Sequence, residues 1–199
     1  MSDLKTQLFC FFSKKYAAIV KQKKEIRKQI REQKKLVTPE QKMLEGATVF
    51  EKIESFPEFK AAKTILMYWA IPDELQTQQT ISKWCLEKKI LLPSIDGNKL
   101  VLKHYFSEGK LIQKTLGIWE PDLTDSYEGN VDLVIVPGIA FDHKKNRLGR
   151  GKGYFDRFFK KCKPFKIGVG FDFQLMNSVP MSKHDIKMDK IVTPSHTIE

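Results

Sequence analysis

The stretch VDLVIVPGIAFDHKKNRLGRGKGYFDRFF, residues 131–159, decides the fold. It begins with a nearly unbroken apolar run, which is typical of a parallel strand covered on both faces. Pro137 and Gly138 end this predicted strand, because proline cannot donate a ladder hydrogen bond and glycine accepts turn geometry. Aromatic residues recur at helical spacing from Tyr154 to Phe159. The stretch therefore predicts a buried strand, a loop and the start of an amphipathic helix.

The loop between the predicted strand and helix alternates cations with glycines: Arg147, Gly149, Arg150, Gly151, Lys152 and Gly153. Glycine lets backbone N–H groups approach a ligand and the cations supply charge, so the pattern favours phosphate binding. A flexible surface loop with solvated charges is the alternative. The glycine spacing fits neither a Walker A loop nor a dinucleotide fingerprint. Asp156, in the first turn of the helix, suits the helix dipole and a hard cation.

Further elements are predicted on both sides of this stretch. Apolar runs and turn signals predict strands over residues 64–71, 90–95, 99–106 and 167–171, the middle two as a hairpin, and helices over about 14–36, 39–55 and 75–89. The alternation of strands and helices predicts an α/β fold, and 199 residues are enough for a single three-layer domain.

The predicted helix over residues 39–55 has a clear start. In Thr38-Pro39-Glu40-Gln41 the threonine can cap, the proline suits the first helical position and the glutamine completes a capping box. Met43, Ala47 and Phe50 mark its expected buried stripe.

The formal net charge is +11, which suits nucleic acid, an acidic membrane surface or an anionic small ligand as partner. Ten lysines and arginines fall within residues 14–35. They form either a solvated cationic face or a phosphate-binding edge, and composition does not separate the two.

The chain has only three cysteines, Cys10, Cys85 and Cys162. A disulfide framework needs more cysteines, and an even number of them, so reduced thiols are expected. The apolar residues 8–12 are too few for a signal-peptide core or a membrane span. We therefore expect a soluble, cytoplasmic protein.

The string NRLGRGKGYFDRF (146–158), preceded by VPGIAFD, closely resembles the signature of the 5-formyltetrahydrofolate cyclo-ligases, also called 5,10-methenyltetrahydrofolate synthetases. Other tracts resemble the family in the same order: KKEIRKQIR (23–31), YWAIPDELQT (68–77), LGIWEP (116–121) and HDIKMD (184–189). One departure lies inside the signature, where Phe155 stands in place of the second tyrosine of many members.

The resemblance implies a role for each matching residue. It assigns ATP binding to Lys23, Arg27, Arg147 and residues 149–153, and magnesium binding to Asp156 and Asp185. It assigns Glu74 to the folate, together with the loop residues 150–153 and Tyr154, which is expected near the reacting formyl group. Arg150, Lys152 and Tyr154 are the expected catalytic residues.

Two of these assignments have structural alternatives. Trp119 either stacks on the pterin ring or is a buried core tryptophan. Asp185 and Asp189, four residues apart, either share a helical face and hold a metal, or serve as a turn cap and a solvated side chain.

The implied reaction converts 5-formyltetrahydrofolate into 5,10-methenyltetrahydrofolate while ATP becomes ADP and phosphate, with Mg²⁺ as cofactor. The implied architecture is a three-layer α/β/α domain over residues 23–199, resembling the NagB/RpiA/CoA-transferase-like fold, preceded by an extension of unassigned role, residues 1–22. We expect a monomer that acts on a reduced folate, and part of the positive charge would favour a polyglutamated one.

Two other functions fit parts of the sequence. A nucleic-acid-binding module would use the basic helix, but it leaves the alternating glycines and the acidic helix start unexplained. A different ATP-dependent ligase or kinase on the same scaffold would bind ATP and magnesium without responding to a formylfolate.

Overall fold

A computed structural model describes residues 2–113, 119–122 and 126–199, without the side chains of residues 2–15. The main sheet has seven strands in the order β12-β11-β9-β6-β1-β2-β3. These strands are β1 (Thr64–Leu66), β2 (Lys89–Asp96), β3 (Lys99–His104), β6 (Leu133–Pro137), β9 (Phe165–Val169), β11 (Lys190–Val192) and β12 (Thr197–Ile198). The five inner strands are parallel, and β3 and β12 pair antiparallel at the two edges.

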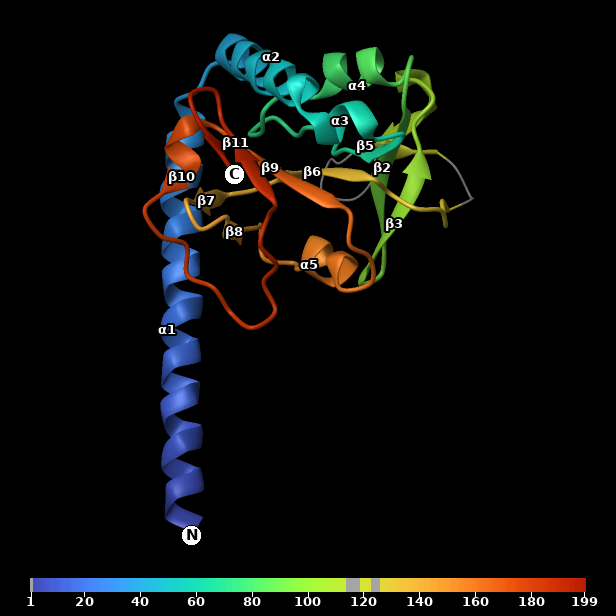
Figure 1. Ribbon diagram of the computed structural model, residues 1–199. Helices are drawn as coiled ribbons and strands as arrows, with labels where there is room; N and C mark the ends of the chain where they lie inside the picture. Colours follow the sequence, from blue (N-terminus) through green and yellow to red (C-terminus); the bar gives the residue numbers. More distant parts are fainter. Residues whose placement is uncertain (1, 114–118, 123–125) are drawn as a thin grey trace.

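Helices cover both faces of the sheet, which gives the three layers expected (Figure 1). Three of them lie together on one face: α2 (Pro39–Ser55), α3 (Pro57–Ala61) and α4 (Gln78–Trp84). The short helix α5 (Tyr154–Phe159) lies on the other. The α/β class with a mostly parallel central sheet is therefore confirmed.

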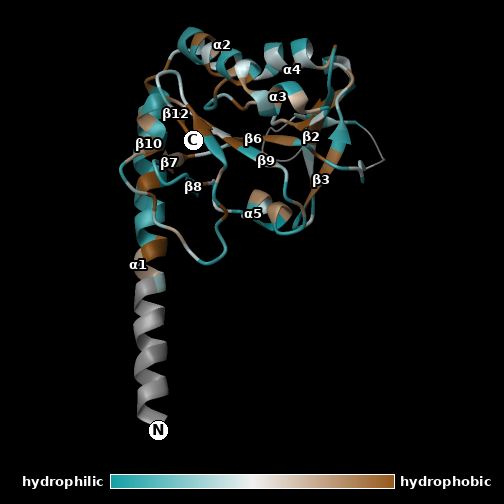
Figure 2. Ribbon diagram, in the orientation of Figure 1, coloured by the Kyte–Doolittle hydropathy of each residue, from teal (hydrophilic) through white to brown (hydrophobic). Residues whose placement is uncertain are grey.

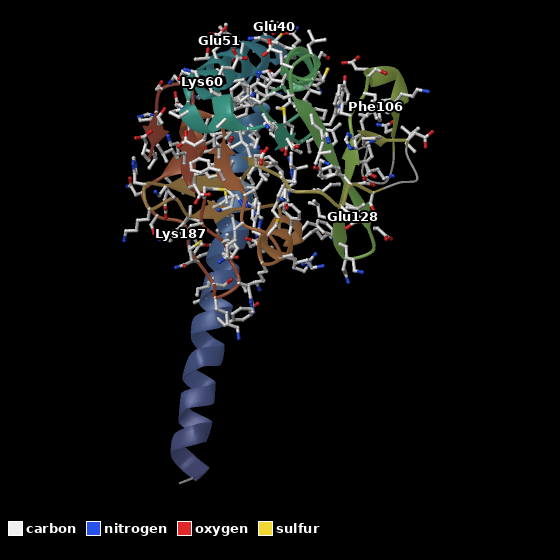
Figure 3. All side chains as sticks on the ribbon, turned by 45° about the vertical axis from the view of Figure 1, so that its right-hand side comes forward. Glu40, Glu51, Lys60, Phe106, Glu128 and Lys187 are labelled. Atoms are coloured by element: carbon white, nitrogen blue, oxygen red, sulfur yellow. The ribbon has the colours of Figure 1, made fainter. Side chains whose placement is uncertain are left out.

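Strand β6 explains why the deciding stretch is apolar at every position. Leu133 and Ile135 pack with the helices α2 to α4, whereas Val134 and Val136 pack against the aromatic residues of α5. All four of these strand side chains are fully buried, so successive side chains of one strand pack into two separate cores. Figure 2 shows β2 and β6 in hydrophobic colours at the centre, and the labelled charged side chains in Figure 3, such as Glu51 and Lys187, lie outside.

Helix α1 (Ser2–Lys35) is the longest element and runs along one side of the domain, and its N-terminal part extends beyond the domain (Figure 1). Its C-terminal half packs Ile26 and Ile30 against a cluster that contains Ile139, Leu148 and Val179. One continuous helix thus passes through the expected boundary between residues 22 and 23.

Two small sheets complete the described part of the fold. The first has three strands: β7 (Ala140–Asp142), β8 (Arg147–Leu148) and β10 (Leu175–Met176). The second pairs β4 (Leu111–Gln113) with β5 (Trp119–Pro121). Two 3₁₀ turns, at Glu108–Lys110 and Asp172–Gln174, lie between strands.

Several local predictions are confirmed. The capping box that starts α2 is complete, with Thr38 and Gln41 exchanging backbone-to-side-chain hydrogen bonds. The hairpin turns at Gly97, whose φ is +54°, a value that favours glycine. The two described cysteines, Cys85 and Cys162, are free thiols, and burial raises the pKa of Cys162.

Other local predictions are wrong. The strand expected over residues 64–71 ends at Leu66, because the Thr77 hydroxyl bonds the backbone of Tyr68 and Ala70 in place of a neighbouring strand. The helix expected from residue 75 begins only at Gln78.

The buried stripe of α2 is also different from the expected one. Phe50 is buried as expected, but Met43 and Ala47 are exposed, and the helix also buries Gly46, Val49 and Ile53. Gly46 lies so close to the loop that a Cβ there would be 2.9 Å from the Gln76 carbonyl oxygen. The segment around Gln76 therefore packs closely against α2 at Gly46, which places Gly46 on the buried face of the helix.

Candidate active site

The glycine-rich loop leads into α5, as predicted, but it does not directly follow β6, because the short strands β7 and β8 lie between them. Its backbone needs glycine at two positions, because φ is +109° at Gly151 and +66° at Gly153. Arg27 of α1 donates from Nε to the Gly149 carbonyl oxygen at 2.9 Å. The structure therefore brings together the basic helix and the glycine-rich loop, two segments 122 residues apart in the sequence.

A buried carboxylate organises the turn before this loop. Asp142 accepts hydrogen bonds from the backbone N–H groups of Lys144, Asn146 and Val179 and from the Asn146 side chain. It is almost fully buried. Sequence analysis missed this residue, and its only signal was an aspartate at the end of an apolar run, where a turn needs capping.

Arg147 lies inward and is buried. Its guanidinium donates to the Pro137 carbonyl oxygen at 3.1 Å and to Asp156 Oδ2 at 3.3 Å, and it lies over the Phe155 ring. Burial lowers the pKa of Arg147, and the nearby carboxylates Asp156 and Asp185 oppose that shift. In this structure Arg147 fixes the position of Asp156 at the start of α5.

The two expected metal ligands lie in neighbouring segments. Asp156 Oδ1 accepts the backbone N–H of Ile186, the residue after Asp185, at 3.1 Å. Asp185 accepts hydrogen bonds from Lys23 of α1 and from Ser182. Burial alone would raise the pKa of Asp185, but these hydrogen bonds lower it.

Asp189 is not part of this pair. Residues 181–189 contain no helix, so Asp185 and Asp189 do not share a helical face. Asp189 instead accepts the Lys166 ammonium at 2.5 Å and the Lys166 backbone N–H at 2.8 Å, which fastens the tail to β9. Within the described residues, no group of three or more His, Cys, Asp or Glu side chains converges as a metal site.

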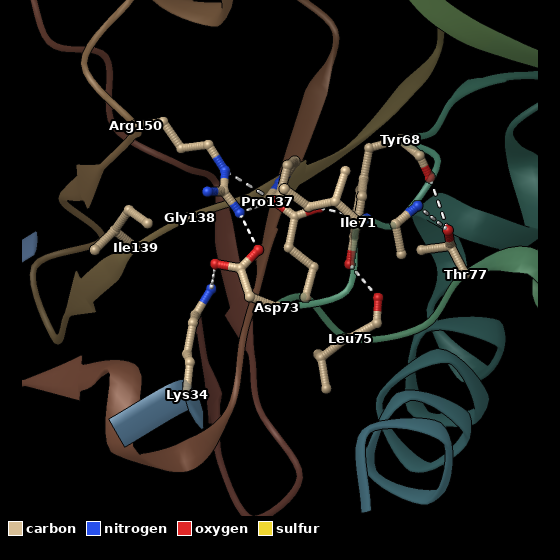
Figure 4. Close-up of polar contacts among 12 residues, drawn as sticks. Lys34, Tyr68, Ile71, Asp73, Leu75, Thr77, Pro137, Gly138, Ile139 and Arg150 are labelled. Atoms are coloured by element: carbon tan, nitrogen blue, oxygen red, sulfur yellow. Dashed lines mark hydrogen bonds and ion pairs between the residues drawn. The ribbon is translucent and has the colours of Figure 1, made fainter. Parts of the chain in front are cut away.

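Arg150 meets Asp73 and Glu74 in the segment that follows β1, and Figure 4 shows its contact with Asp73. Arg150 donates from Nη2 to Glu74 Oε1 at 3.0 Å and to Asp73 Oδ1 at 2.5 Å. Burial raises the pKa of Glu74, and Arg150 and Lys34 oppose that shift. Arg150 of the glycine-rich loop and Glu74, the residue expected to bind the folate, thus belong to one cluster.

Lys34 also belongs to this cluster, which sequence analysis missed by grouping it with the solvated lysines. Its side chain is 2% exposed, and its Nζ lies 3.9 Å from Asp73 Oδ2. Burial lowers the pKa of Lys34, and Asp73 and Glu74 oppose that shift.

A pocket of about 690 Å³ is lined by Pro72 and Gln76, on either side of Asp73 and Glu74 in the chain, although none of the four charged side chains lines it. It is lined by residues of α2, the 69–80 segment and the β4–β5 ribbon, among them Met43, Trp69, Pro72 and Trp119. Trp119 is 42% exposed, so the alternative of a buried core tryptophan is wrong. The exposed Met43 is explained in the same way, because it faces the pocket and not the core.

The other two expected catalytic residues are Lys152 of the loop and Tyr154, the first residue of α5. Lys152 is exposed, and among the described residues its ammonium has no hydrogen-bond or ion-pair partner. The Tyr154 hydroxyl lies 3.5 Å from the Gly97 carbonyl oxygen of the hairpin turn, and Arg157 lies over its ring. The structure does not bring Tyr154 into contact with Glu74.

The chain resembles known proteins over most of its length. A family model described as the 5-formyltetrahydrofolate cyclo-ligase family matches residues 19–194. The 5-formyltetrahydrofolate cyclo-ligase of Escherichia coli is 32% identical over 181 residues, covering 85% of this chain and 99% of that protein. The mouse protein of the same name is 27% identical, covering 85% of this chain and 92% of that one.

Solved structures agree. The NMR structure of Aquifex aeolicus 5,10-methenyltetrahydrofolate synthetase matches with a TM-score of 0.79 and 33% identity, over 88% of this chain and 91% of that chain. A 5,10-methenyltetrahydrofolate synthetase from Mycoplasma pneumoniae matches with a TM-score of 0.70 over 87% of this chain and 99% of that one, and at 20% identity it supports the fold alone. The chain therefore belongs to the 5-formyltetrahydrofolate cyclo-ligase family.

Proposed function

We propose that this chain catalyses the ATP-dependent conversion of 5-formyltetrahydrofolate into 5,10-methenyltetrahydrofolate, with release of ADP and phosphate. The observation that carries the proposal is the contact of Arg150 with Glu74 beside the pocket of about 690 Å³. The contact joins the glycine-rich loop, which is suited to phosphate, to the segment whose Pro72 and Gln76 line a pocket large enough for a pterin-sized ligand.

The chemical difficulty is that a formamide is a poor electrophile and its oxygen is a poor leaving group. Transfer of the γ-phosphoryl group to the formyl oxygen, with ADP leaving, makes that oxygen expellable. Attack of nitrogen 10 on the formyl carbon closes the ring. Nitrogen 10 then loses its proton, and the bond between the formyl carbon and oxygen breaks as phosphate leaves with that oxygen. The protein's contribution is to position the two substrates and neutralise charge.

The residues divide between the two substrates. Lys23, Arg27, Arg150 and Lys152 supply positive charge for the phosphates, and the N–H groups of residues 149–153 supply hydrogen bonds. Arg147 contributes indirectly, because its hydrogen bond positions the Asp156 carboxylate. Glu74 orients the folate and Trp119 offers an aromatic face for its pterin ring, while Tyr154 approaches the formyl group only if it leaves the Gly97 carbonyl oxygen.

Asp156 and Asp185 would hold magnesium. The donor set fits, because Mg²⁺ takes one or two carboxylates and completes its shell with water and phosphate oxygens. Bound there, the ion would neutralise phosphate charge. The Lys23 ammonium donates a hydrogen bond to Asp185 in this structure, and this bond would have to break before Asp185 could bind magnesium.

The cellular setting is also proposed. We propose a monomer that works in the cytoplasm, with the positive charge of α1 favouring polyglutamated folates. In the part of the chain that the structure describes, no helix is long and apolar enough to cross a membrane.

The test is an assay of the purified chain with 5-formyltetrahydrofolate and magnesium ATP. It follows the near-ultraviolet absorbance of the methenyl product and the release of ADP together, with and without a chelator. We expect a metal-dependent rise with one ADP per product. ATP hydrolysis without methenyl product would reject the folate reaction and favour another ATP-dependent ligase on this scaffold.

A further inference from the structure

Lys34 is the most deeply buried member of a four-charge cluster that also contains Asp73, Glu74 and Arg150. Its side chain is 2% exposed, and it lies in the last turn of the helix, so it reaches the carboxylates from a rigid element. Figure 4 shows Lys34 and Arg150 approaching Asp73 from opposite sides. The two cations balance the two carboxylates Asp73 and Glu74.

The two cations are not equally free to move. Arg150 lies on the glycine-rich loop and its side chain is 45% exposed, so it can change partners when an anionic substrate enters. Lys34 is enclosed and cannot follow. If Arg150 leaves for a phosphate or a substrate carboxylate, Asp73 and Glu74 keep Lys34 as their counter-charge.

We infer that Lys34 is a positioning residue that acts as a fixed counter-ion for Asp73 and Glu74, so that Arg150 can transfer to the substrate's anionic groups. The inference rests on the proposed function. Its physical basis is the cost of leaving two nearby carboxylates in a partly desolvated site without a cation. Without Lys34, Arg150 would be held by the acids and the site would carry excess negative charge toward its anionic substrates.

The groups that face Glu74 are Arg150 from the loop, Lys34 from α1, and Asp73 and Tyr68 from its own segment. Because Lys34 opposes the rise in the pKa of Glu74, its removal should raise that pKa further. The acid side of the pH–rate profile should then move to higher pH.

The experiment compares Lys34→Met with Lys35→Met, the neighbouring exposed lysine that pairs only with Glu32 among the described residues. In wild-type protein that converts the formylfolate, we expect Lys34→Met to lower kcat/KM about tenfold or more, chiefly through KM. Lys34→Arg should recover most of the loss, and Lys35→Met should match wild type.

The double variant Lys34→Met/Asp73→Asn separates charge from packing. It removes one charge of each sign, and asparagine keeps an oxygen that can accept from Arg150. We expect kcat/KM and the pH profile to return toward wild type. If the folded double variant is as impaired as Lys34→Met, or if Lys34→Met matches Lys35→Met, the inference is wrong.

Two controls make each outcome decisive. Thermal unfolding verifies that each variant is folded. If Lys34→Met does not fold, the folded double variant is compared with wild type, and a loss of about tenfold or more in its kcat/KM would contradict the inference. An inactive wild-type chain would reject the proposed function itself, which distinguishes that failure from failure of the inference.

Discussion

The glycine-rich loop offers the sharpest prediction from backbone geometry. Gly151 has φ +109°, and a Cβ there would lie 3.5 Å from the Arg27 guanidinium carbon, which is ordinary van der Waals contact. Gly151→Ala therefore introduces no severe clash, and its cost is conformational. A non-glycine residue in such a region costs about 1–3 kcal/mol.

This cost falls on the loop shape that is proposed to cradle phosphate. If the loop relaxes in the free protein and must return to this shape when ATP binds, about 1–3 kcal/mol corresponds to roughly a 5-fold to 150-fold loss in kcat/KM for ATP. The matched control is Gly109→Ala. Gly109 lies in an exposed 3₁₀ turn without a positive φ, and nothing lies within 4 Å of its added Cβ.

The assay is steady-state turnover at varied ATP, with thermal unfolding as the check on folding. Gly151→Ala should lose activity while remaining folded at the assay temperature, and Gly109→Ala should match wild type. If both variants stay within about twofold of wild type while folded, the loop geometry does not matter as argued.

Two further predictions concern charge and pH. Lys152→Ala should remove most turnover without changing the unfolding midpoint, whereas Lys144→Ala, an exposed lysine before the loop, should leave turnover unchanged; normal turnover of Lys152→Ala would contradict its catalytic role. Burial alone would raise the pKa of Asp172, but hydrogen bonds from Thr193 and Ser195 lower it from 3.8 to about 2, so its stabilisation is complete above pH 3.8 and is lost as pH falls toward 2. Asp172→Asn should therefore cost about 1 kcal/mol at pH 7, allowing for solvent screening, and the gap in urea unfolding should shrink below pH 4; an equal gap at both pH values would contradict this assignment.

Much of the fold follows from local signals. The capping box from Thr38 to Gln41, the Asp96–Asn98 turn and the doubly apolar strand of residues 133–137 each carry a short-range physical cause that survives in the structure. Each of these features is determined by residues close to it in the sequence, so it can be predicted from a local sequence pattern.

The site was harder to predict because the residues that contact one another in it come from segments far apart in the sequence. Lys34 looks like its solvated neighbours until α1 docks beside residues 73–74, and only then does burial set it apart. Met43 and Trp119 are apolar residues that line a pocket, and hydrophobic patterning alone cannot distinguish a pocket wall from a core. Residues 68–71 looked like strand because they are apolar, but Thr77 binds their backbone instead.

The central claim is that the formyl oxygen is activated by phosphoryl transfer in the site that Arg150, Glu74 and the glycine-rich loop form. It is tested most directly with 5-formyltetrahydrofolate that carries a heavy oxygen isotope in its formyl group, turned over by the wild-type chain with magnesium ATP. Mass spectrometry of the released phosphate reads the outcome. We predict one labelled oxygen per phosphate, because the formyl oxygen leaves as part of the phosphate. Unlabelled phosphate with formation of the methenyl product would contradict the account.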